Sequence, residues 1–462
     1  MTTTTGEITV TSPFDGRELG SVPSHDEAHV QRCIGVAEHA RSSSVPQPHE
    51  RAEVLERAVV LLGERADAFA ESISAEAGKP ITIAAGEVER AIDTLRYAAI
   101  EARTLAGDVV PMAGTSAGAG TVGITLRLPV GVVAAITPFN FPLNLVVHKL
   151  APAIAAGCPI VHKPASATPL TSVLLHELLR DAGQDPDRLH LVTGSGRTVG
   201  DALVVDPRIR HISFTGSSEV GWALPRRAHR ARVSLELGNS TPLLVFDDAD
   251  LDAAVDAAAR FGYAFAGQSC IAVQRLLVQR PVYDDVVERM TEAVSKIAFG
   301  DPSDPDVACG PVIDSDARDT VLARIRDAVD AGARLVTGGD HDGNVIEPAL
   351  LVDVDPRLDV SCAELFGPAV VMTPFDDEPE AVALANGTPY GLQAGVFTSN
   401  VSRAIRVAEQ LEFGGVTVNV PPTFRSDQMP YGGTKQSGNT KEGPRWAVRE
   451  LTEERLVLLG RG

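Results

Sequence analysis

The spacing of hydrophobic residues changes along this chain. Near the N-terminus two short runs flank Asp15-Gly16, a dipeptide typical of tight hairpin turns, and this predicts two short strands. Two or three amphipathic helices are expected next. In the second, apolar residues recur at helical spacing, and the helix is expected to stop at Gly78-Lys79-Pro80; these residues are Val54, Leu55, Ala58, Val59, Leu61 and Leu62.

From Gly131 onward, short apolar runs alternate with helical patterns. This alternation is typical of a parallel sheet covered by helices, of the Rossmann type. A second α/β series runs from about Leu243 to Val420 and predicts another domain. The first series consists of a helix over Asn144–Ala156 and strands over Val132–Ile136, Ile160–His162, Leu189–Thr193, His211–Phe214 and Val233–Leu237.

Two strand-like segments lie outside these series. Thr121–Leu128 follows a loop rich in glycine and alanine, Pro111–Gly123, and is expected to be an edge or exchanged strand. Leu451–Leu459 predicts a terminal strand whose partner could be another subunit. Because exposed strand edges need partners, these segments favour a homo-oligomer.

Composition excludes several classes of protein. With 462 residues the chain should form at least two domains, and its net charge of -20 disfavours nucleic acid or anionic membrane as a partner. Five scattered cysteines without a CxxC pair indicate neither a disulfide framework nor a metal site. The start lacks a signal-peptide pattern, and prolines interrupt the uncharged stretch Leu128–Val147, so we expect a cytoplasmic protein with a buried strand, loop and helix there.

Cys270 is the first candidate for chemistry. It follows the small-residue run Ala266-Gly267-Gln268-Ser269 and precedes an apolar strand expected over Ile271–Val278. A thiol on such a turn is open to substrate and to its own backbone amide. A lone cysteine is, however, more often a buried filler, so its neighbours decide the interpretation.

Glu236 and Asn140 are the other two candidates. Glu236 lies in a run that otherwise predicts a buried strand, where desolvation would raise its pKa toward that of a general base near neutrality. The alternative is a glutamate at the exposed end of the strand. Asn140 follows a predicted strand in a loop fixed by Pro138 and Pro142, where its amide could donate to an oxyanion or simply serve the turn.

Two further segments favour nucleotide binding. The run from Phe214 to Gly221 joins a strand to a helix, so its backbone N–H groups could meet a diphosphate at the helix N-terminus. Lys163 follows another strand on the carboxyl edge of the same sheet, where a ribose or phosphate contact is reasonable and a solvated lysine is the usual alternative.

Taken together, these residues resemble the aldehyde dehydrogenase superfamily over nearly the whole chain and in one order. The closest resemblance is to the lactaldehyde and phosphonoaldehyde dehydrogenase-like branch, through Pro422–Arg425 and Met429–Gly433. Six motifs carry the family resemblance: Asn140-Phe141-Pro142, Lys163-Pro164, Phe214-Thr215-Gly216-Ser217, Glu236-Leu237-Gly238, Gly267-Gln268-Ser269-Cys270 and Glu364-Leu365-Phe366-Gly367-Pro368.

The resemblance implies an α/β, aldehyde dehydrogenase-like fold with a Rossmann-type cofactor domain, an α/β catalytic domain and a small strand-exchange element for oligomerisation. We assign residues 1–117 and 131–240 to the cofactor domain, 241–436 to the catalytic domain, and 118–130 and 437–462 to the oligomerisation element. A homodimer or homotetramer is implied.

The resemblance also implies roles. Cys270 would be the nucleophile, Asn140 the oxyanion donor and Glu236 the base that activates water, while Glu364 and Phe366 would grip the nicotinamide ribose. Substrate contacts are expected from Phe141, Ser269 and Arg425, and no metal is expected. The expected cofactor-binding residues are Thr137, Pro138, Phe139, Lys163, Ser166, Gly196, Phe214, Thr215, Gly216, Ser217, Gly221, Leu237, Glu364 and Phe366.

Cofactor and substrate are less closely defined. Family members that exclude NADP tend to carry an acidic residue after Lys-Pro-Ala, whereas Ser166 and Ala167 stand here, so NAD is preferred on general grounds and NADP stays open. Arg425 favours a small hydroxylated or anionic aldehyde if it enters the tunnel, and otherwise forms a structural ion pair; Arg275 is expected to be structural.

Three rival functions were weighed. Succinate-semialdehyde relatives tend to carry an arginine where His148 stands. The CoA-acylating branch typically lacks the base that Glu236 provides. A non-catalytic binding protein of the same fold would not need all three catalytic residues. The sequence also departs from the family pattern at Asn239, in place of a second glycine, and at Asn439-Thr440-Lys441.

Overall fold

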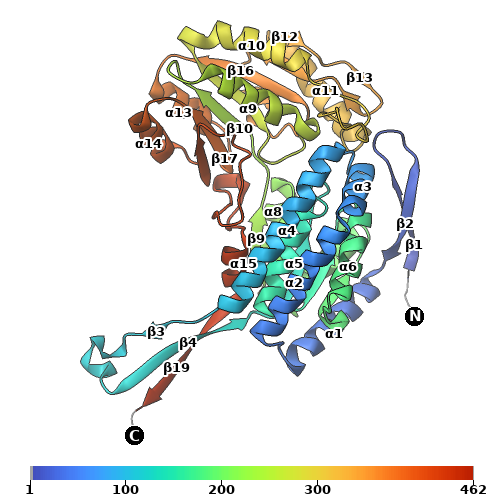
Figure 1. The fold of residues 1–462 in the computed structure, drawn as a ribbon, viewed down its shortest axis with the longest axis vertical. Coiled ribbons are helices and arrows are strands. Elements are labelled where there is room, and N and C mark those ends of the chain that lie inside the picture. The colour runs from blue at the N-terminus through green and yellow to red at the C-terminus, as the bar shows by residue number, and fades with distance from the viewer. Residues whose placement is uncertain (1–3, 461–462) are drawn as a thin grey trace.

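The computed structural model describes residues 4–460 and consists of two α/β bodies with a projecting arm (Figure 1). At the N-terminus, β1 (Thr4–Thr11) and β2 (Glu18–His25) form the predicted antiparallel hairpin. Four helices follow, not two or three: α1 (Glu27–Ser43), α2 (Pro48–Glu64), α3 (Ala66–Ala77) and α4 (Ile81–Thr104).

The predicted end of the second helix was therefore wrong. The helix α2 ends at Glu64, and Gly78 ends α3 instead, with a left-handed φ of 67° that suits glycine. The break between α2 and α3 lies at Arg65, whose φ is -110°. Gly63 stands two residues before Arg65, in the last turn of α2, and is the local signal for this break.

The first body contains the predicted parallel sheet, which has five strands in the order β7-β6-β5-β8-β9. Its strands match the predicted runs to within two residues at each end. Its elements are β5 (Val132–Ile136), α5 (Asn144–Ala156), β6 (Ile160–Lys163), α6 (Leu170–Asp181), β7 (Leu189–Leu191), α7 (Asp201–Val205), β8 (Ile209–Thr215), α8 (Ser218–Arg227) and β9 (Arg232–Glu236).

The second body contains a seven-stranded sheet in the order β12-β15-β16-β11-β10-β17-β18, parallel except at β12. It is the predicted second α/β series. Its main elements are β10 (Thr241–Val245), α9 (Leu251–Tyr263), β11 (Val273–Gln279), α10 (Tyr283–Ser295), α11 (Ser315–Asp330), β12 (Arg334–Thr337), β15 (Ala349–Val352), β16 (Ala369–Phe375), α13 (Glu378–Asn386), β17 (Gln393–Phe397), α14 (Val401–Gln410) and β18 (Gly415–Val418). Its shorter elements are β13 (His341–Asp342), β14 (Val345–Ile346) and α12 (Asp359–Cys362).

The arm is a three-stranded sheet in the order β19-β4-β3. The central strand β4 (Thr121–Pro129) pairs antiparallel with β19 (Thr452–Gly460) and with β3 (Val109–Val110). Both predicted outlying strands therefore exist. The partner of the terminal strand, which the sequence left open to another subunit, lies in the same chain.

The predicted domain division stays a prediction, and the structure differs from its boundaries at two places. The strand β3 joins the arm although it precedes residue 118. The helix α15 (Pro444–Glu450) packs against α4 and α5 in the first body, although it follows residue 437. Hydrophobic packing, which sequence position does not reveal, places this helix.

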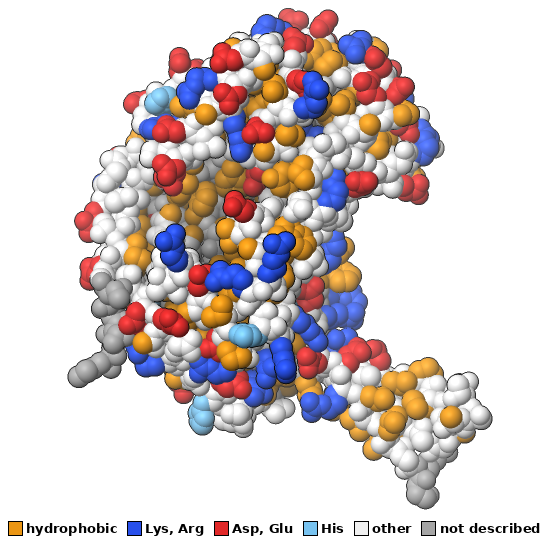
Figure 2. Space-filling model, turned by 180° about the vertical axis from the view of Figure 1, so that it is seen from behind, with side chains coloured by type: hydrophobic (Ala, Val, Ile, Leu, Met, Phe, Trp, Pro, Cys, Tyr) orange, Lys and Arg blue, Asp and Glu red, His pale blue; other side chains and the backbone are white. Residues whose placement is uncertain are grey.

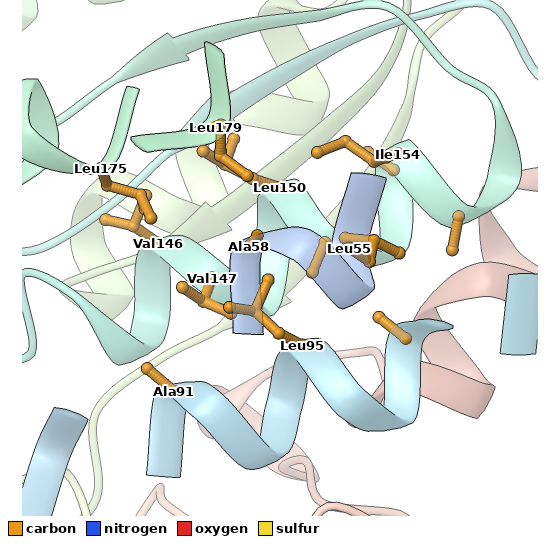
Figure 3. Close-up of a cluster of buried hydrophobic side chains, with 14 of the residues drawn as sticks. Leu55, Ala58, Ala91, Leu95, Val146, Val147, Leu150, Ile154, Leu175 and Leu179 are labelled. Atoms are coloured by element: carbon orange, nitrogen blue, oxygen red, sulfur yellow. The ribbon is translucent and has the colours of Figure 1, made fainter. Parts of the chain in front are cut away.

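A layer of helices forms the largest buried cluster of the first body. Figure 3 shows side chains of α2, α4, α5 and α6 meeting there, among them Leu55, Leu95, Leu150 and Leu179. This packing holds α5, whose N-terminus follows the loop that carries Asn140. The stretch 128–147 is the predicted strand, loop and helix start, and within residues 4–460 no helix is long and apolar enough to cross a membrane.

Candidate active site

Cys270 lies on a strained loop between α9 and β11. Phe265 and Ala266 both adopt a φ of 52°, and Gly267 a φ of 66°. A side chain at Gly267 would meet the carbonyl oxygen of Gly367 at 2.2 Å, so only glycine fits. The following strand begins at Val273, not at Ile271 as predicted, because the turn continues until the Ala272 N–H donates to the Ser269 carbonyl, at 3.0 Å.

Asn140 lies beside this loop. Its side chain is buried, and its Nδ2 donates to the carbonyl oxygen of Gln268 at 3.0 Å. The loop is fixed by Glu87 of α4, whose Oε1 accepts from the backbone N–H groups of Leu143 and Asn144. Glu87 also forms a buried ion pair with Lys79.

Lys79 also contacts an aromatic side chain on each of the two loops. Its Nζ lies 3.7 Å from the ring centroid of Phe141 and 4.5 Å from that of Phe265. The rings of Phe141 and Phe265 meet edge to face. Ser269, another expected substrate contact, uses its hydroxyl as an acceptor for the Ile271 N–H at 3.5 Å. The loops that carry Asn140 and Cys270 are thus held together by N-terminal helices.

Glu236 is the last residue of β9 and is buried, so the alternative of an exposed glutamate is wrong. Within residues 4–460, neither carboxylate oxygen of Glu236 has a hydrogen-bond partner. Burial, reinforced by the nearby Glu442 carboxylate, raises the pKa of Glu236 well above its usual value. A carboxylate with such a raised pKa can exchange a proton near neutral pH.

Arg425 and Tyr431 complete the surroundings of the thiol. The Tyr431 hydroxyl lies 3.3 Å from Cys270 Sγ, and the Arg425 guanidinium lies 4.0 Å above the Tyr431 ring. Arg425 Nη2 donates to Glu442 at 2.6 Å, which is the ion pair that the sequence offered as an alternative. Within residues 4–460, Arg425 Nε and Nη1 have no hydrogen-bond partner.

The sequence did not point to the charged neighbours of Arg425, which are Glu442, Lys149, Arg90 and Asp427. Its partner Glu442 is also 3.6 Å from the buried Lys149. Arg90 of α4 lies close enough to Arg425, Asp427 and Tyr431 for their charges to act on its pKa. Its Nη2 is buried without a hydrogen-bond partner among the described residues. Arg90 shares its face of α4 with the buried polar residues Glu87 and Thr94, a grouping that could have signalled it.

His148 also lies beside Arg425 and Asp427. Its Nδ1 lies 3.5 Å from Arg425 Nη2, and its Nε2 lies 3.4 Å from Asp427. Arg275 is remote from this cluster and donates to the backbone carbonyls of Ser240, Leu384 and Ala385, as expected of a structural residue.

A hollow suited to a dinucleotide lies at the carboxyl edge of the five-stranded sheet, next to α8. Its walls carry three cations and two acids, Asp201 and Glu219, and Asp201 pairs with Arg227. Ser217 caps the N-terminus of α8, where backbone N–H groups would favour a diphosphate. Burial lowers the pKa of Lys163 to about 8. The expected residues Lys163, Gly196 and Phe214 line the hollow with Ile136, Arg197 and Arg227, among others.

Other expected cofactor residues support the walls. A side chain on Gly221 would meet Leu237 at 2.3 Å, so α8 packs directly on the strand end that carries the base. Ser166 donates to the Gly194 carbonyl, and Thr137 is 3.1 Å from His162 Nε2. Pro138 lies in the loop after β5, and the Gly216 N–H after Thr215 donates to the Glu236 carbonyl at 3.1 Å.

Glu364 and Phe366 reach the same region from the second body. Glu364 accepts from the Asn239 N–H at 3.2 Å, and burial raises its pKa to about 7. A side chain on Gly238 would meet the Glu364 carboxylate at 2.2 Å. Phe366 has a left-handed φ of 53° and its ring meets that of Phe139 edge to face.

The departures from the family pattern have structural roles. Asn239 donates to Thr241 and to the Gln393 carbonyl, which ties the end of β9 to the second sheet. Along the edge of β9, the side chain of Asn439 accepts from the Leu235 N–H and donates to the Val233 carbonyl. Lys441 donates to the Gly432 carbonyl at 2.7 Å. The hydrogen bonds of these polar residues hold the backbone around Glu236 in place.

Comparison with known proteins decides the family. The model of the aldehyde dehydrogenase family matches residues 1–457. The chain belongs to the aldehyde dehydrogenase family. It is 39% identical to a 3-sulfolactaldehyde dehydrogenase of Priestia aryabhattai, over 99% of this chain and 96% of the relative. A lactaldehyde dehydrogenase of Methanococcus vannielii is 35% identical over 98% and 97% of the two chains. These names agree with the lactaldehyde-like branch that the motifs predicted.

Other relatives are named for different substrates and cofactors. A succinate-semialdehyde dehydrogenase [NADP(+)] of Escherichia coli is 39% identical over 98% of this chain and 94% of its own. A crystal structure of an aldehyde dehydrogenase from Brucella melitensis matches with a TM-score of 0.95 and 40% identity, over 99% of this chain and 94% of that one. A glyceraldehyde-3-phosphate dehydrogenase from Methanocaldococcus jannaschii, complexed with NADP, matches with a TM-score of 0.95 and 34% identity, over 99% and 100%. The α/β aldehyde dehydrogenase fold and an aldehyde dehydrogenase activity follow.

Proposed function

We propose that this aldehyde dehydrogenase oxidises a small hydroxylated or anionic aldehyde to its carboxylic acid, through a thiohemiacetal and then a thioester on Cys270. The observation that carries the proposal is the convergence of three elements on one site. The thiol of Cys270, the amide of Asn140 and the unpartnered buried carboxylate of Glu236 come from separate parts of the chain.

Formation of the thiohemiacetal needs a nucleophile and an oxyanion donor. The Cys270 sulfur forms the bond to the carbonyl carbon, and the electron pair of the C=O bond moves to oxygen. Asn140 uses one N–H of its amide on Gln268, which leaves the second N–H to donate to that oxygen. The fixed loop around Asn140 prevents the amide from turning away.

Hydrolysis needs a base in a dry site. Glu236 takes a proton from water as the water oxygen attacks the thioester carbon, and the C–S bond breaks with its electron pair returning to Cys270. The absence of hydrogen-bond partners on the Glu236 carboxylate in residues 4–460 keeps both oxygens free for water. Its raised pKa suits proton transfer near neutral pH.

The hollow beside α8 would hold NAD(P), which would supply the hydride acceptor for the oxidation. Lys163 and the N-terminus of α8 would hold its ribose and phosphates, and Glu364 with Phe366 would hold the nicotinamide ribose. NAD is our preferred cofactor. Ser166 carries no charge to repel a 2′-phosphate, so NADP is the second cofactor to test.

Two guanidinium groups favour an anionic substrate. Arg425 Nε and Nη1 are unpaired within residues 4–460, and so is the buried Nη2 of Arg90. A carboxylate, sulfonate or phosphonate on the aldehyde would supply acceptors for these donors. The test is a panel of short aldehydes, neutral, hydroxylated and anionic, assayed with both cofactors by the absorbance of the reduced cofactor. Equal use of neutral and anionic aldehydes would contradict this substrate class.

Substituting Arg425→Ala separates substrate recognition from structure. Charge-assisted hydrogen bonds to an anionic group contribute about 1.5–3 kcal/mol, which is roughly 10- to 150-fold in binding. We expect kcat/KM to fall by that factor for a phosphono- or carboxy-aldehyde, with little change for propanal. Equal losses on both aldehydes would assign Arg425 to its ion pair with Glu442 alone, and a loss on lactaldehyde only would indicate hydroxyl recognition.

Two rival functions have distinct outcomes in the same assays. A CoA-acylating enzyme would need CoA for turnover and yield an acyl-CoA, whereas hydrolysis by Glu236 yields the free acid. A succinate-semialdehyde enzyme would prefer that aldehyde in the panel. A non-catalytic protein would reduce no cofactor with any aldehyde.

We also propose a homodimer or homotetramer in the cytoplasm. All five cysteines are free, as a reducing compartment requires. Hydrophobic side chains gather on the projecting arm (Figure 2), and Leu456 and Leu458 of β19 are 52% exposed. The outer edge of β19 has no strand partner within residues 4–460. An exposed apolar strand edge of this kind favours association.

Light scattering is expected to give a multiple of the 48.6 kDa chain mass. Leu456→Glu should shift the protein toward smaller species, because the charge would be buried in the interface. Val401→Glu on α14 is the matched control, since Val401 is 72% exposed but lies away from the arm. A fully active monomer at assay concentration would contradict the assembly.

A further inference from the structure

The Tyr431 hydroxyl lies within hydrogen-bond distance of Cys270 Sγ, at 3.3 Å. Within residues 4–460 this hydroxyl has no other hydrogen-bond partner. Tyr431 belongs to the motif Met429–Gly433, and none of the steps proposed for Cys270, Asn140 and Glu236 uses its hydroxyl. A buried phenol whose one polar contact is a nucleophilic sulfur needs an explanation.

The surroundings hold the phenol in place. Its ring packs in a small cluster with Ile271 and Leu392, and Cys270 packs against the same cluster. The backbone of Tyr431 exchanges hydrogen bonds in both directions with Glu442. The Arg425 guanidinium covers one face of the ring. The hydroxyl therefore has a fixed direction, toward the sulfur.

We propose that the Tyr431 hydroxyl donates a hydrogen bond to the Cys270 thiolate and is a catalytic residue of this enzyme. The inference rests on the proposed function, in which Cys270 is the nucleophile. The S–H bond breaks, the proton passes to solvent base, and the electron pair stays on sulfur beside the Tyr431 O–H. The same bond stabilises the sulfur when the C–S bond of the thioester breaks and its electron pair returns.

The surroundings of the thiol oppose its ionisation, and a hydrogen-bond donor at the sulfur offsets this effect. Burial raises the pKa of Cys270 to about 12, and the carboxylates of Glu364 and Glu236 also raise it. Tyr431 and the Arg425 guanidinium oppose this rise. Burial also raises the pKa of Tyr431 well above its usual value, so the phenol keeps its proton and stays a donor.

The test is the alkylation of Cys270 by iodoacetamide as a function of pH, followed by mass spectrometry of the peptide that contains it. In Tyr431→Phe the ring and its packing remain, and only the hydroxyl is lost. A hydrogen bond to a charged group of ordinary strength predicts a rise of about one unit in the thiol pKa and an alkylation rate about tenfold lower at neutral pH. We expect kcat to fall with it, while cofactor affinity stays unchanged.

Tyr283→Phe is the matched control. Tyr283 is also buried and its hydroxyl donates to the Met372 carbonyl, far from the thiol. This variant should lose stability without any change in the alkylation profile. A second variant with 3-fluorotyrosine at position 431 keeps the ring size and makes the phenol a stronger donor, so its thiol pKa should fall.

Coincident alkylation profiles of Tyr431→Phe and the native protein would overturn the proposal, as would a fluorinated variant with a raised thiol pKa. Neither result depends on the aldehyde. Because alkylation needs no turnover, failure of this inference is distinct from failure of the proposed function, which full turnover by Cys270→Ser would reveal.

Discussion

Replacing Cys270 by serine is expected to abolish aldehyde oxidation, with a loss of more than roughly a thousandfold in kcat. A serine hydroxyl has a much higher pKa than a thiol and is a far weaker nucleophile near neutral pH. The hollow beside α8 is separate from the sulfur, so cofactor binding should stay nearly intact. Steady-state reduction of the cofactor and its binding by calorimetry measure the two quantities.

Cys33→Ser provides the control for this prediction. Cys33 lies on α1, far from the nucleophile loop, and undergoes the same chemical change. Turnover should be retained in that variant. Undiminished turnover in Cys270→Ser would remove Cys270 from the mechanism, whatever the aldehyde tested.

Glu236→Gln should lose steady-state turnover while still giving a burst of reduced cofactor. The amide cannot take a proton from water, so the thioester forms once and then persists. In the native enzyme, deacylation should increase with pH as Glu236 loses its proton, and the raised pKa of this carboxyl moves the increase toward neutral pH. Stopped-flow absorbance separates the burst from the steady rate.

A buried glutamate elsewhere is the matched control for Glu236. Glu76 of α3 is equally buried and accepts from the backbone N–H groups of Leu170 and Thr171 at the start of α6. Glu76→Gln should change stability without changing the ratio of burst to steady rate. Near-native turnover in Glu236→Gln would place the base elsewhere, and loss of the burst would give Glu236 a second role in activating the thiol.

Sequence patterns predicted the elements that carry their own signals. The bounds of α5 were predicted to the residue, because its apolar pattern marks its start and Gly157 follows its last residue, Ala156. The bounds of β5 were also predicted to the residue, for similar reasons. The break between α2 and α3 was missed although Gly63 stands two residues before Arg65. Local residues set the bounds of α5 and β5, whereas the packing of α2 and α3 against α4 sets the position of the break.

The candidate site was predictable where family motifs cover it, and unpredictable where tertiary contacts make it. Motifs led to Cys270, Glu236 and Asn140. The pairing of Arg425 with Glu442 and the approach of Arg90 depend on how α4 packs beside the C-terminal segment. Tyr431 is conspicuous only as an aromatic residue in sequence. Its relation to the sulfur depends on the loop between Tyr431 and Glu442, which no periodicity reveals.

The pairing of β4 with β19 has a consequence for synthesis on the ribosome. The nearest paired residues, Pro129 and Thr452, are 323 positions apart. At translation rates of about 5–20 residues per second, β4 waits roughly a quarter of a minute to a minute for its partner. Throughout that time the edge of β4 that faces β19 stays unpaired, so a chaperone that shields this edge during translation should raise the yield of native enzyme.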